Sequence, residues 1–285
     1  MPERIEIFEV GPRDGLQNEK RCIPTAEKIA LVNALSRAGF KRIEAASFVS
    51  PKWIPQMADG GDVLAGIVRV EGVSYTALTP NMKGFERAMQ ARADEIAIFA
   101  SASEGFSRAN LNCSVSESLD RFAPVAAAAK AAGIGMRGYV SCVTDCPFDG
   151  PTPPHRVAEV AQALKAMGCY EISLGDTIGK GTPETVGAML ETVLTGIPAA
   201  ELAGHYHDTN GCALQNIGAS LELGLRVFDA AVAGLGGCPY APGAQGNVAT
   251  ETVLAHVEAM GFETGLDAAA VAAAGRMAQA MRTKG

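Results

Sequence analysis

The sequence lacks the features that mark several broad classes of protein. No block of Lys or Arg appears among its 24 basic residues, and 31 acidic residues give it a formal net charge of −7. An acidic chain without a basic block matches the nucleic-acid backbone poorly, so we expect no nucleic-acid partner. The longest uncharged stretch, residues 230–250, holds five glycines and two prolines. This composition is typical of loops and argues against a membrane span.

Two further absences bear on the compartment. The first ten residues carry acidic side chains and no apolar run, so we expect no signal peptide. Seven cysteines, an odd number in a mid-sized chain, indicate free thiols in a reducing compartment. We therefore expect a cytoplasmic protein with no membrane partner.

The chain does contain a repeated alternation of strand and helix patterns. Short β-branched runs are each followed by a longer helical pattern, and their starts lie about 20 to 40 residues apart, the length of one strand plus one helix. The predicted strands cover residues 5–10, 42–47, 73–79, 95–101, 135–142, 171–177, 202–209 and 227–234. Eight alternations without an antiparallel hairpin signal favour a (β/α)8 TIM barrel over a doubly wound sheet.

Composition and helix signals agree with this architecture. With 48% hydrophobic and 19% charged residues, the 285-residue chain can bury a core. Thr25 is expected to cap a helix over residues 26–38, and Thr182 before Pro183 is expected to open another. An alanine-rich tract at 268–274 predicts a last helix outside the barrel. With no repeat or linker, we expect residues 1–285 to form a single barrel domain with additional C-terminal helices.

Polar side chains collect at the predicted strand ends. In a barrel these ends share one rim, which is where TIM-barrel enzymes carry their chemistry. In chain order the candidates are Arg13, Asp14, Gln17, Glu44, Ser47, Tyr139, Ser173, Asp176, His205, His207, Cys238 and Asn247.

The His205-Tyr206-His207 segment is the sharpest local signal. Residues at i and i+2 on a strand share a face, so both imidazoles point the same way. The pair suits metal binding, but two hydrogen-bonded core histidines fit the pattern equally well. Asp14 and Asn247 would complete an open, catalytic type of site. The imidazoles favour zinc, iron or manganese and the oxygens favour magnesium or manganese, so the ligand set leaves the metal open.

Arg13 and Glu44 have two readings each. Arg13 beside Asp14 is commonly a surface ion pair, whereas a constrained turn between Gly11 and Gly15 would direct both side chains inward. Arg13 would then donate two parallel hydrogen bonds to a carboxylate or an enolate oxygen. Glu44 lies in an apolar strand, where burial is costly without a partner. It either pairs with a cation, Arg13 first, or faces water.

Cys238 lies among glycines in residues 234–240. Most free cysteines are small buried hydrophobic groups. The glycines, however, let the backbone approach a ligand closely, which favours a proton donor or nucleophile at this position. The other six cysteines are interpreted as structural.

These residues carry a family resemblance. Residues 9–20 (EVGPRDGLQNEK) and 233–240 (AGLGGCPY) resemble the two signatures of 3-hydroxy-3-methylglutaryl-CoA lyase. The resemblance extends through residues 204–209 (GHYHDT) and 246–251 (GNVATE) and covers nearly the whole chain in the right order. The related isopropylmalate and homocitrate synthases share the Arg-Asp and His-X-His features but are usually longer.

The resemblance implies an activity and a set of roles. It implies cleavage of 3-hydroxy-3-methylglutaryl-CoA to acetyl-CoA and acetoacetate with Mg²⁺ or Mn²⁺. The metal ligands would be Asp14, His205, His207 and Asn247, with Asp14 or His205 as the base. Arg13 would stabilise the thioester oxygen, Glu44 would orient Arg13, and Cys238 would help to protonate the enolate carbon. Substrate contacts are expected from Gln17, Ser47, Tyr139, Ser173 and Asp176.

Two alternatives remain open at this point. One is a related lyase for a bulkier 3-hydroxy-3-alkylglutaryl-CoA, and the other is a non-catalytic barrel that binds CoA esters or metal. The oligomeric state is also open, with a homodimer as one arrangement.

Overall fold

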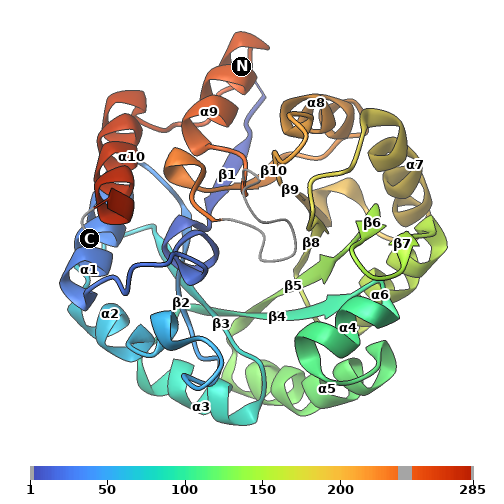
Figure 1. The fold of residues 1–285 in the computed structure, drawn as a ribbon, viewed down its shortest axis with the longest axis horizontal. Coiled ribbons are helices and arrows are strands. Elements are labelled where there is room, and N and C mark those ends of the chain that lie inside the picture. The colour runs from blue at the N-terminus through green and yellow to red at the C-terminus, as the bar shows by residue number, and fades with distance from the viewer. Residues whose placement is uncertain (1–2, 237–245, 284–285) are drawn as a thin grey trace.

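Eight parallel strands close into a barrel at the centre of the computed structural model, which describes residues 3–236 and 246–283 (Figure 1). Around the barrel the order is β1-β10-β9-β8-β5-β4-β3-β2. The strand bounds are β1 Glu6–Glu9, β2 Arg42–Ser47, β3 Ser74–Leu78, β4 Glu95–Ser101, β5 Gly135–Ser141, β8 Glu171–Asp176, β9 Leu202–Tyr206 and β10 Val227–Ala230. The prediction of a (β/α)8 barrel is confirmed.

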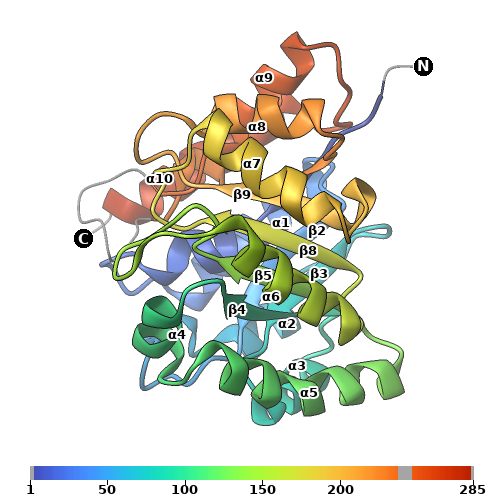
Figure 2. The same cartoon turned by 90° about the vertical axis from the view of Figure 1, so that its right-hand side faces the viewer.

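Helices surround the barrel as an outer ring (Figures 1 and 2). Their bounds are α1 Thr25–Arg37, α2 Gly60–Gly66, α3 Met82–Gln90, α4 Glu104–Leu111, α5 Val115–Ala132, α6 Pro154–Ala166, α7 Pro183–Leu194, α8 Ala213–Glu222, α9 Thr250–Ala259 and α10 Ala268–Thr283. The short elements are a π-helical turn η1 at Gly11–Gly15 and 3₁₀ turns η2 Pro55–Met57, η3 Ala199–Glu201 and η4 Val232–Gly234. Among the described helices, none is both long and apolar enough to cross a membrane.

The two helix starts predicted from threonine caps have different outcomes. Thr182 accepts a hydrogen bond from the Thr185 backbone and caps α7, as predicted. Thr25 is not a cap, because α1 begins at Thr25 itself and its hydroxyl donates to Asp59 at 2.7 Å. The sequence also gave no sign of the small antiparallel pair formed by β6 (Asp145–Cys146) and β7 (Gly150–Pro151).

The two faces of the barrel strands differ in character. Apolar side chains such as Ile96, Ile98 and Ile172 are fully buried in the main hydrophobic cluster. Charged side chains are also buried, and Glu44, Arg137 and Asp229 are at most 2% exposed. Burying a charge is costly unless it is paired. Each of these three residues therefore needs a partner of opposite charge inside the barrel.

The C-terminal helix α10 packs on the outside of the barrel, as predicted. Val271, Ala274 and Ala278 are buried on one of its faces, and α10 contacts α1, α9 and η4. Glu251, in the first turn of α9, accepts the Ala233 backbone N–H at 2.9 and 3.1 Å. The helix α10 therefore lies against the turn that follows β10.

The close approach of α10 to Glu251 makes Gly275 sensitive to substitution. A Cβ atom at Gly275 would overlap Glu251 Oε1. We expect Gly275→Ala to lower the free energy of unfolding by about 1–2 kcal/mol, because Glu251 must release the Ala233 N–H. The matched control is Gly187→Ala in α7, where a Cβ meets nothing within 4 Å. That change should stabilise the protein by about 0.5–1 kcal/mol through helix propensity. Thermal and denaturant unfolding of both variants checks the pair, and equal stabilisation by both would contradict the packing argument.

Candidate metal and active site

Asp14 is presented by a tight turn directly after β1. The backbone N–H groups of Arg13, Asp14 and Gly15 all bond to the Val10 carbonyl, at 3.2, 2.8 and 3.2 Å. Within this π-helical turn Arg13 is buried and only 6% exposed. Arg13 therefore lies in the barrel interior, and the partly exposed Asp14 side chain lies beside it. The prediction of an ordinary surface ion pair is wrong.

Arg13 lies between two carboxylates. Its Nε and Nη2 atoms both lie 2.6 Å from Glu44 Oε2, and Nη1 donates to Asp14 Oδ1 at 2.6 Å. The guanidinium lies over the Tyr139 ring at 5.6 Å. Burial alone lowers the pKa of Arg13, but Glu44 and Asp14 outweigh it and raise the pKa, so the side chain stays charged. Glu44 is fully buried and does not face water.

Two buried polar atoms beside Arg13 remain without a partner. Among the described residues, neither Glu44 Oε1 nor the Tyr139 hydroxyl makes a hydrogen bond. Unsatisfied buried polar atoms are rare in folded proteins, and they are accounted for by water or a ligand. Their position next to Arg13 is consistent with a place where substrate oxygens bind.

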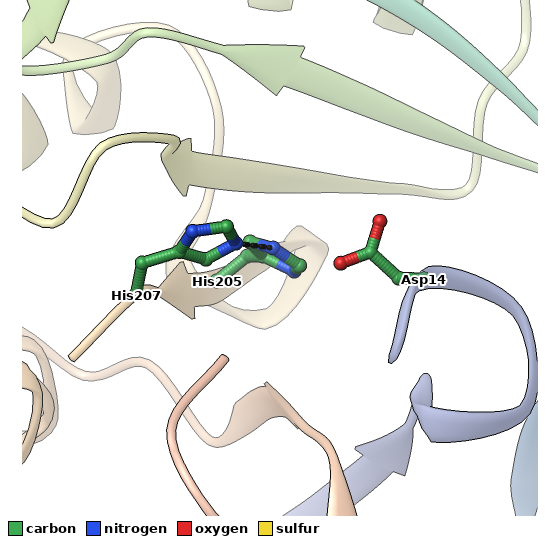
Figure 3. A group of neighbouring side chains, drawn as sticks. All are labelled: Asp14, His205 and His207. Carbon is green, nitrogen blue, oxygen red and sulfur yellow. Dashed lines mark hydrogen bonds between the residues drawn. The ribbon is translucent and has the colours of Figure 1, made fainter. Parts of the chain in front are cut away.

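His205 and His207 point toward the same space as Asp14 (Figure 3). Their Nε2 atoms are 3.4 Å apart. A potential ligand atom from each of Asp14, His205 and His207 can be chosen so that all lie within 4.8 Å of one another. Asn247 joins the group by donating from Nδ2 to Asp14 Oδ2 at 2.8 Å. The four residues predicted as metal ligands therefore converge, although they are up to 233 positions apart in the chain.

The position of Asn247 depends on a close backbone contact. Its Nδ2 also donates to the Leu235 carbonyl at 3.1 Å. Gly236 has φ +100°, and a Cβ there would lie 2.9 Å from Asn247 Nδ2. Only glycine allows this combination of backbone angle and side-chain contact. The amide can bring its oxygen to a cation only if it rotates or exchanges its present bonds.

The donor set fits a divalent cation. Burial alone raises the pKa of Asp14, but Arg13 and the histidines lower it to about 2, so a carboxylate is present at neutral pH. Burial and the neighbouring His205 lower the pKa of His207 to about 4, which keeps this imidazole neutral. One carboxylate and two imidazoles with room for further oxygens can hold a divalent cation, and this donor set does not select one metal.

Other predicted site residues have contacts elsewhere. Asp176 accepts hydrogen bonds from Thr144 Oγ1 at 2.8 Å and from the backbone of Lys180 and Gly181, so its carboxylate holds the loop after β8. The Ser47 hydroxyl accepts the Val49 N–H at 3.3 Å. Gln17 is half-buried just beyond η1. Cys238 lies outside the described residues.

Two further residues beside the site, Arg137 and Asp229, were not predicted from the sequence. Arg137 Nη1 and Nη2 donate to the two oxygens of Asp229 at 3.0 and 2.7 Å. Asp229 Oδ2 also lies 2.8 Å from the Ser173 hydroxyl and 3.0 Å from His205 Nδ1. Each of these residues is a charged side chain in an otherwise apolar or uncharged strand, Arg137 in β5 and Asp229 in β10. That isolated charge was the one feature of the sequence that could have indicated a buried pair.

Nearly the whole chain is similar to known proteins. A family model described as HMGL-like matches residues 4–278. The chain is 57% identical over 267 residues to the mitochondrial hydroxymethylglutaryl-CoA lyase of Rattus norvegicus, covering 94% of this chain and 82% of that protein. It is 54% identical over 276 residues to the 3-hydroxy-3-isohexenylglutaryl-CoA/hydroxymethylglutaryl-CoA lyase of Pseudomonas aeruginosa, covering 97% and 92%.

Solved structures give the same result. The HMG-CoA lyase of Brucella melitensis superposes with a TM-score of 0.98 at 61% identity, covering 99% of this chain and 100% of that one. An HMG-CoA lyase from Acinetobacter baumannii in complex with coenzyme A and 3-methylmalate superposes with a TM-score of 0.93 at 39% identity, covering 98% and 91%.

Another buried carboxylate, Glu9, supports the turn that carries Asp14. It accepts the backbone N–H groups of Gly11 at 2.9 Å and Val232 at 3.0 Å, and the Thr250 hydroxyl at 2.7 Å. It thereby ties the end of β1 to η4 and α9. Burial is the largest influence on its pKa and raises it from the ordinary 4.5 to about 8, against these hydrogen bonds.

The raised pKa of Glu9 predicts a pH dependence of stability. The folded state holds the Glu9 proton more tightly than the unfolded state. The stability that Glu9 contributes is therefore fully present below pH 4.5, decreases above it and is lost as the pH rises through about 8. In Glu9→Gln the amide can keep all three contacts without a charge. We expect the thermal midpoint of this variant, relative to wild type, to increase between pH 4.5 and pH 8. The exposed Glu258→Gln change controls for loss of one carboxylate, and a pH-independent difference for Glu9→Gln would refute the assignment.

Proposed function

This chain belongs to the hydroxymethylglutaryl-CoA lyase family, and we propose that the site described above cleaves 3-hydroxy-3-methylglutaryl-CoA to acetyl-CoA and acetoacetate. The matches that show the family cover nearly the whole chain. The protein is accordingly a carbon–carbon lyase. The observation that carries the site assignment is the convergence of Asp14, His205 and His207 beside the buried Arg13.

We propose Mg²⁺ or Mn²⁺ as the ion that these residues hold. Asp14, His205 and His207 would supply the ligand atoms that already converge. The Asn247 side-chain oxygen would be the fourth ligand once its amide rotates. When bound, such an ion acidifies a substrate hydroxyl and neutralises a carboxylate. The ionised Asp14 and the neutral His207 are the protonation states that this role requires.

The chain's own groups account for the movement of the proton and the charge. Asp14 takes the proton of the tertiary hydroxyl on a carboxylate oxygen. His205 is the alternative base, and in that role its Nε2 lone pair would not coordinate the ion. As the carbon–carbon bond breaks, negative charge develops on the thioester oxygen of the acetyl-CoA enolate. We expect Arg13 to stabilise that charge, and its ion pairs with Glu44 and Asp14, which hold the guanidinium in position, support this role. Cys238, eight residues beyond the end of β10, then supplies the proton to the enolate carbon.

Substrate contacts come from the neighbouring strands. Tyr139, whose buried hydroxyl has no hydrogen-bond partner within residues 3–236 and 246–283, is the substrate contact with the most structural support. Gln17, Ser47, Ser173 and Asp176 complete the predicted set, with Ser173 and Asp176 acting through the groups that they bind. A CoA thioester is the partner, in line with the coenzyme A bound to the Acinetobacter baumannii relative.

The wider setting is proposed on more general grounds. We propose that residues 1–285 work as one catalytic domain, in the cytoplasm. The cysteines among the described residues are all free thiols, which suits a reducing compartment. A homodimer remains one arrangement, and no nucleic-acid or membrane partner is proposed.

A bulkier substrate is the second candidate. One relative at 54% identity is named for both the 3-isohexenyl and the 3-methyl ester. Release of acetyl-CoA from each purified ester, measured side by side, distinguishes the two. A higher kcat/KM on the 3-isohexenyl ester than on the 3-methyl ester would make the bulkier ester the preferred substrate.

Metal removal is the first test of the mechanism. We expect exhaustive dialysis against a chelator to abolish cleavage of 3-hydroxy-3-methylglutaryl-CoA, and Mg²⁺ or Mn²⁺ to restore it, because the hydroxyl proton is otherwise too weakly acidic. Circular dichroism before and after dialysis controls for unfolding. Full activity of the folded, metal-free protein would exclude the proposed role of the ion.

Arg13→Lys tests the second part of the site. A lysine cannot contact Glu44 and Asp14 while also reaching an enolate oxygen, since it lacks the planar fork. We expect kcat to fall by about 10²–10³ with a smaller change in KM, as for loss of an oxyanion donor. Arg156→Lys, in an exposed pair with Glu159, is the matched control and should be nearly silent. An Arg13→Lys enzyme that keeps most of its kcat would remove Arg13 from charge stabilisation.

A further inference from the structure

The Nδ1 side of the His205 ring contacts the Asp229 carboxylate, which has no role in the proposed reaction steps. His205 Nδ1 lies 3.0 Å from Asp229 Oδ2, and the Asp229 side chain is fully buried. An ionised carboxylate has no proton to donate, so the hydrogen at this contact belongs to Nδ1. The lone pair of His205 is then on Nε2, the atom that faces His207 and the space beside Asp14.

Asp229 is kept ionised by the groups around it. Arg137 donates to both of its oxygens at 2.7 and 3.0 Å, and Ser173 donates to Oδ2 at 2.8 Å. The two charge-assisted hydrogen bonds from Arg137 favour the ionised form of this buried carboxylate. The carboxylate therefore has a fixed charge and a fixed direction.

Arg137 is itself fixed at the centre of the barrel. Its Nε donates to Glu171 Oε1 at 2.6 Å, and its guanidinium lies over the Phe8 ring at 4.2 Å. Glu171 in turn accepts two hydrogen bonds from Arg42 at 3.0 and 3.2 Å. A chain of paired charges thus runs from the start of β2 through the interior to His205.

The second histidine has no comparable support. His207 Nδ1 is buried and has no hydrogen-bond partner among the described residues. The orientation of one ligand is therefore specified by a charged partner, and that of the other is not. This asymmetry singles out His205.

We propose that Asp229 is the positioning residue for His205, fixing the tautomer and ring direction that present Nε2 to the metal, and that Arg137 holds Asp229 in place. This inference rests on the proposed metal site. Partners of this kind, behind a metal-binding histidine, typically change metal affinity by about 10–100-fold.

The first test measures the wild-type protein, and one variant serves only to assign its signals. In wild-type protein saturated with Mg²⁺ and labelled with ¹⁵N-histidine, a long-range ¹H–¹⁵N correlation spectrum reports which ring nitrogen carries the proton. The His205 signals are assigned by their loss in His205→Gln. We expect the proton on Nδ1, and a His205 ring protonated on Nε2 alone would overturn the proposal.

The second test separates positioning from general packing. Asp229→Asn keeps the shape and removes the charge that faces His205, whereas Glu171→Gln removes a charge from the other side of the same Arg137. We expect Mn²⁺ binding, titrated without substrate by the spin-resonance signal of the free ion, to weaken by about 10–100-fold in Asp229→Asn. Glu171→Gln should bind Mn²⁺ as the wild type does.

The outcomes are distinguishable from those of the parent proposal. Wild-type affinity in folded Asp229→Asn, or equal weakening in Glu171→Gln, would overturn the positioning role while the metal site stands. Failure of the wild-type protein to bind Mn²⁺ would overturn both. If Asp229→Asn does not fold, the tautomer in the wild-type protein still decides the matter.

Discussion

Burial of charge inside a closed barrel is the constraint on which this site depends. An isolated charge there is prohibitively costly, so each one must be held by a partner of opposite sign or by several hydrogen bonds. Arg13 is bound between Glu44 and Asp14, and Asp229 between Arg137 and His205. The pairing that removes the cost of burial also fixes each group in direction and protonation state. The catalytic geometry is thus a consequence of how the interior is neutralised.

The barrel topology turns sequence distance into contact. The strands β1, β9 and β10 are neighbours in the sheet although they come from opposite ends of the chain. Asp14, in the turn after β1, therefore lies near His205 of β9 and His207 just beyond that strand (Figure 3). It also accepts a hydrogen bond from Asn247, in the segment beyond β10. Glu9 and Glu251 hold η4, which follows β10, so the first and last quarters of the chain stabilise the same side of the site.

Much of this could be predicted from the sequence, and the remainder has a physical explanation. The eight strands follow from spacing, and the common face of His205 and His207 follows from the two-residue strand repeat. The Arg137–Asp229 pair could not be found, because its members are 92 residues apart and each looks like a lone charge in a strand. Asp176 was predicted to contact substrate. Its carboxylate instead accepts hydrogen bonds from the Lys180 and Gly181 backbone and holds the loop after β8. The N-terminal start of α1 was misplaced because Thr25 bonds to Asp59, which is remote in sequence.

The central claim is that Asp14, His205 and His207 bind one divalent cation next to Arg13. Crystals grown with Mn²⁺, measured by anomalous diffraction at the manganese edge, test it most directly. We expect a single strong anomalous peak within coordination distance of an Asp14 oxygen and the Nε2 atoms of both histidines. A peak at another position, or none at this one in crystals containing saturating Mn²⁺, would contradict the account.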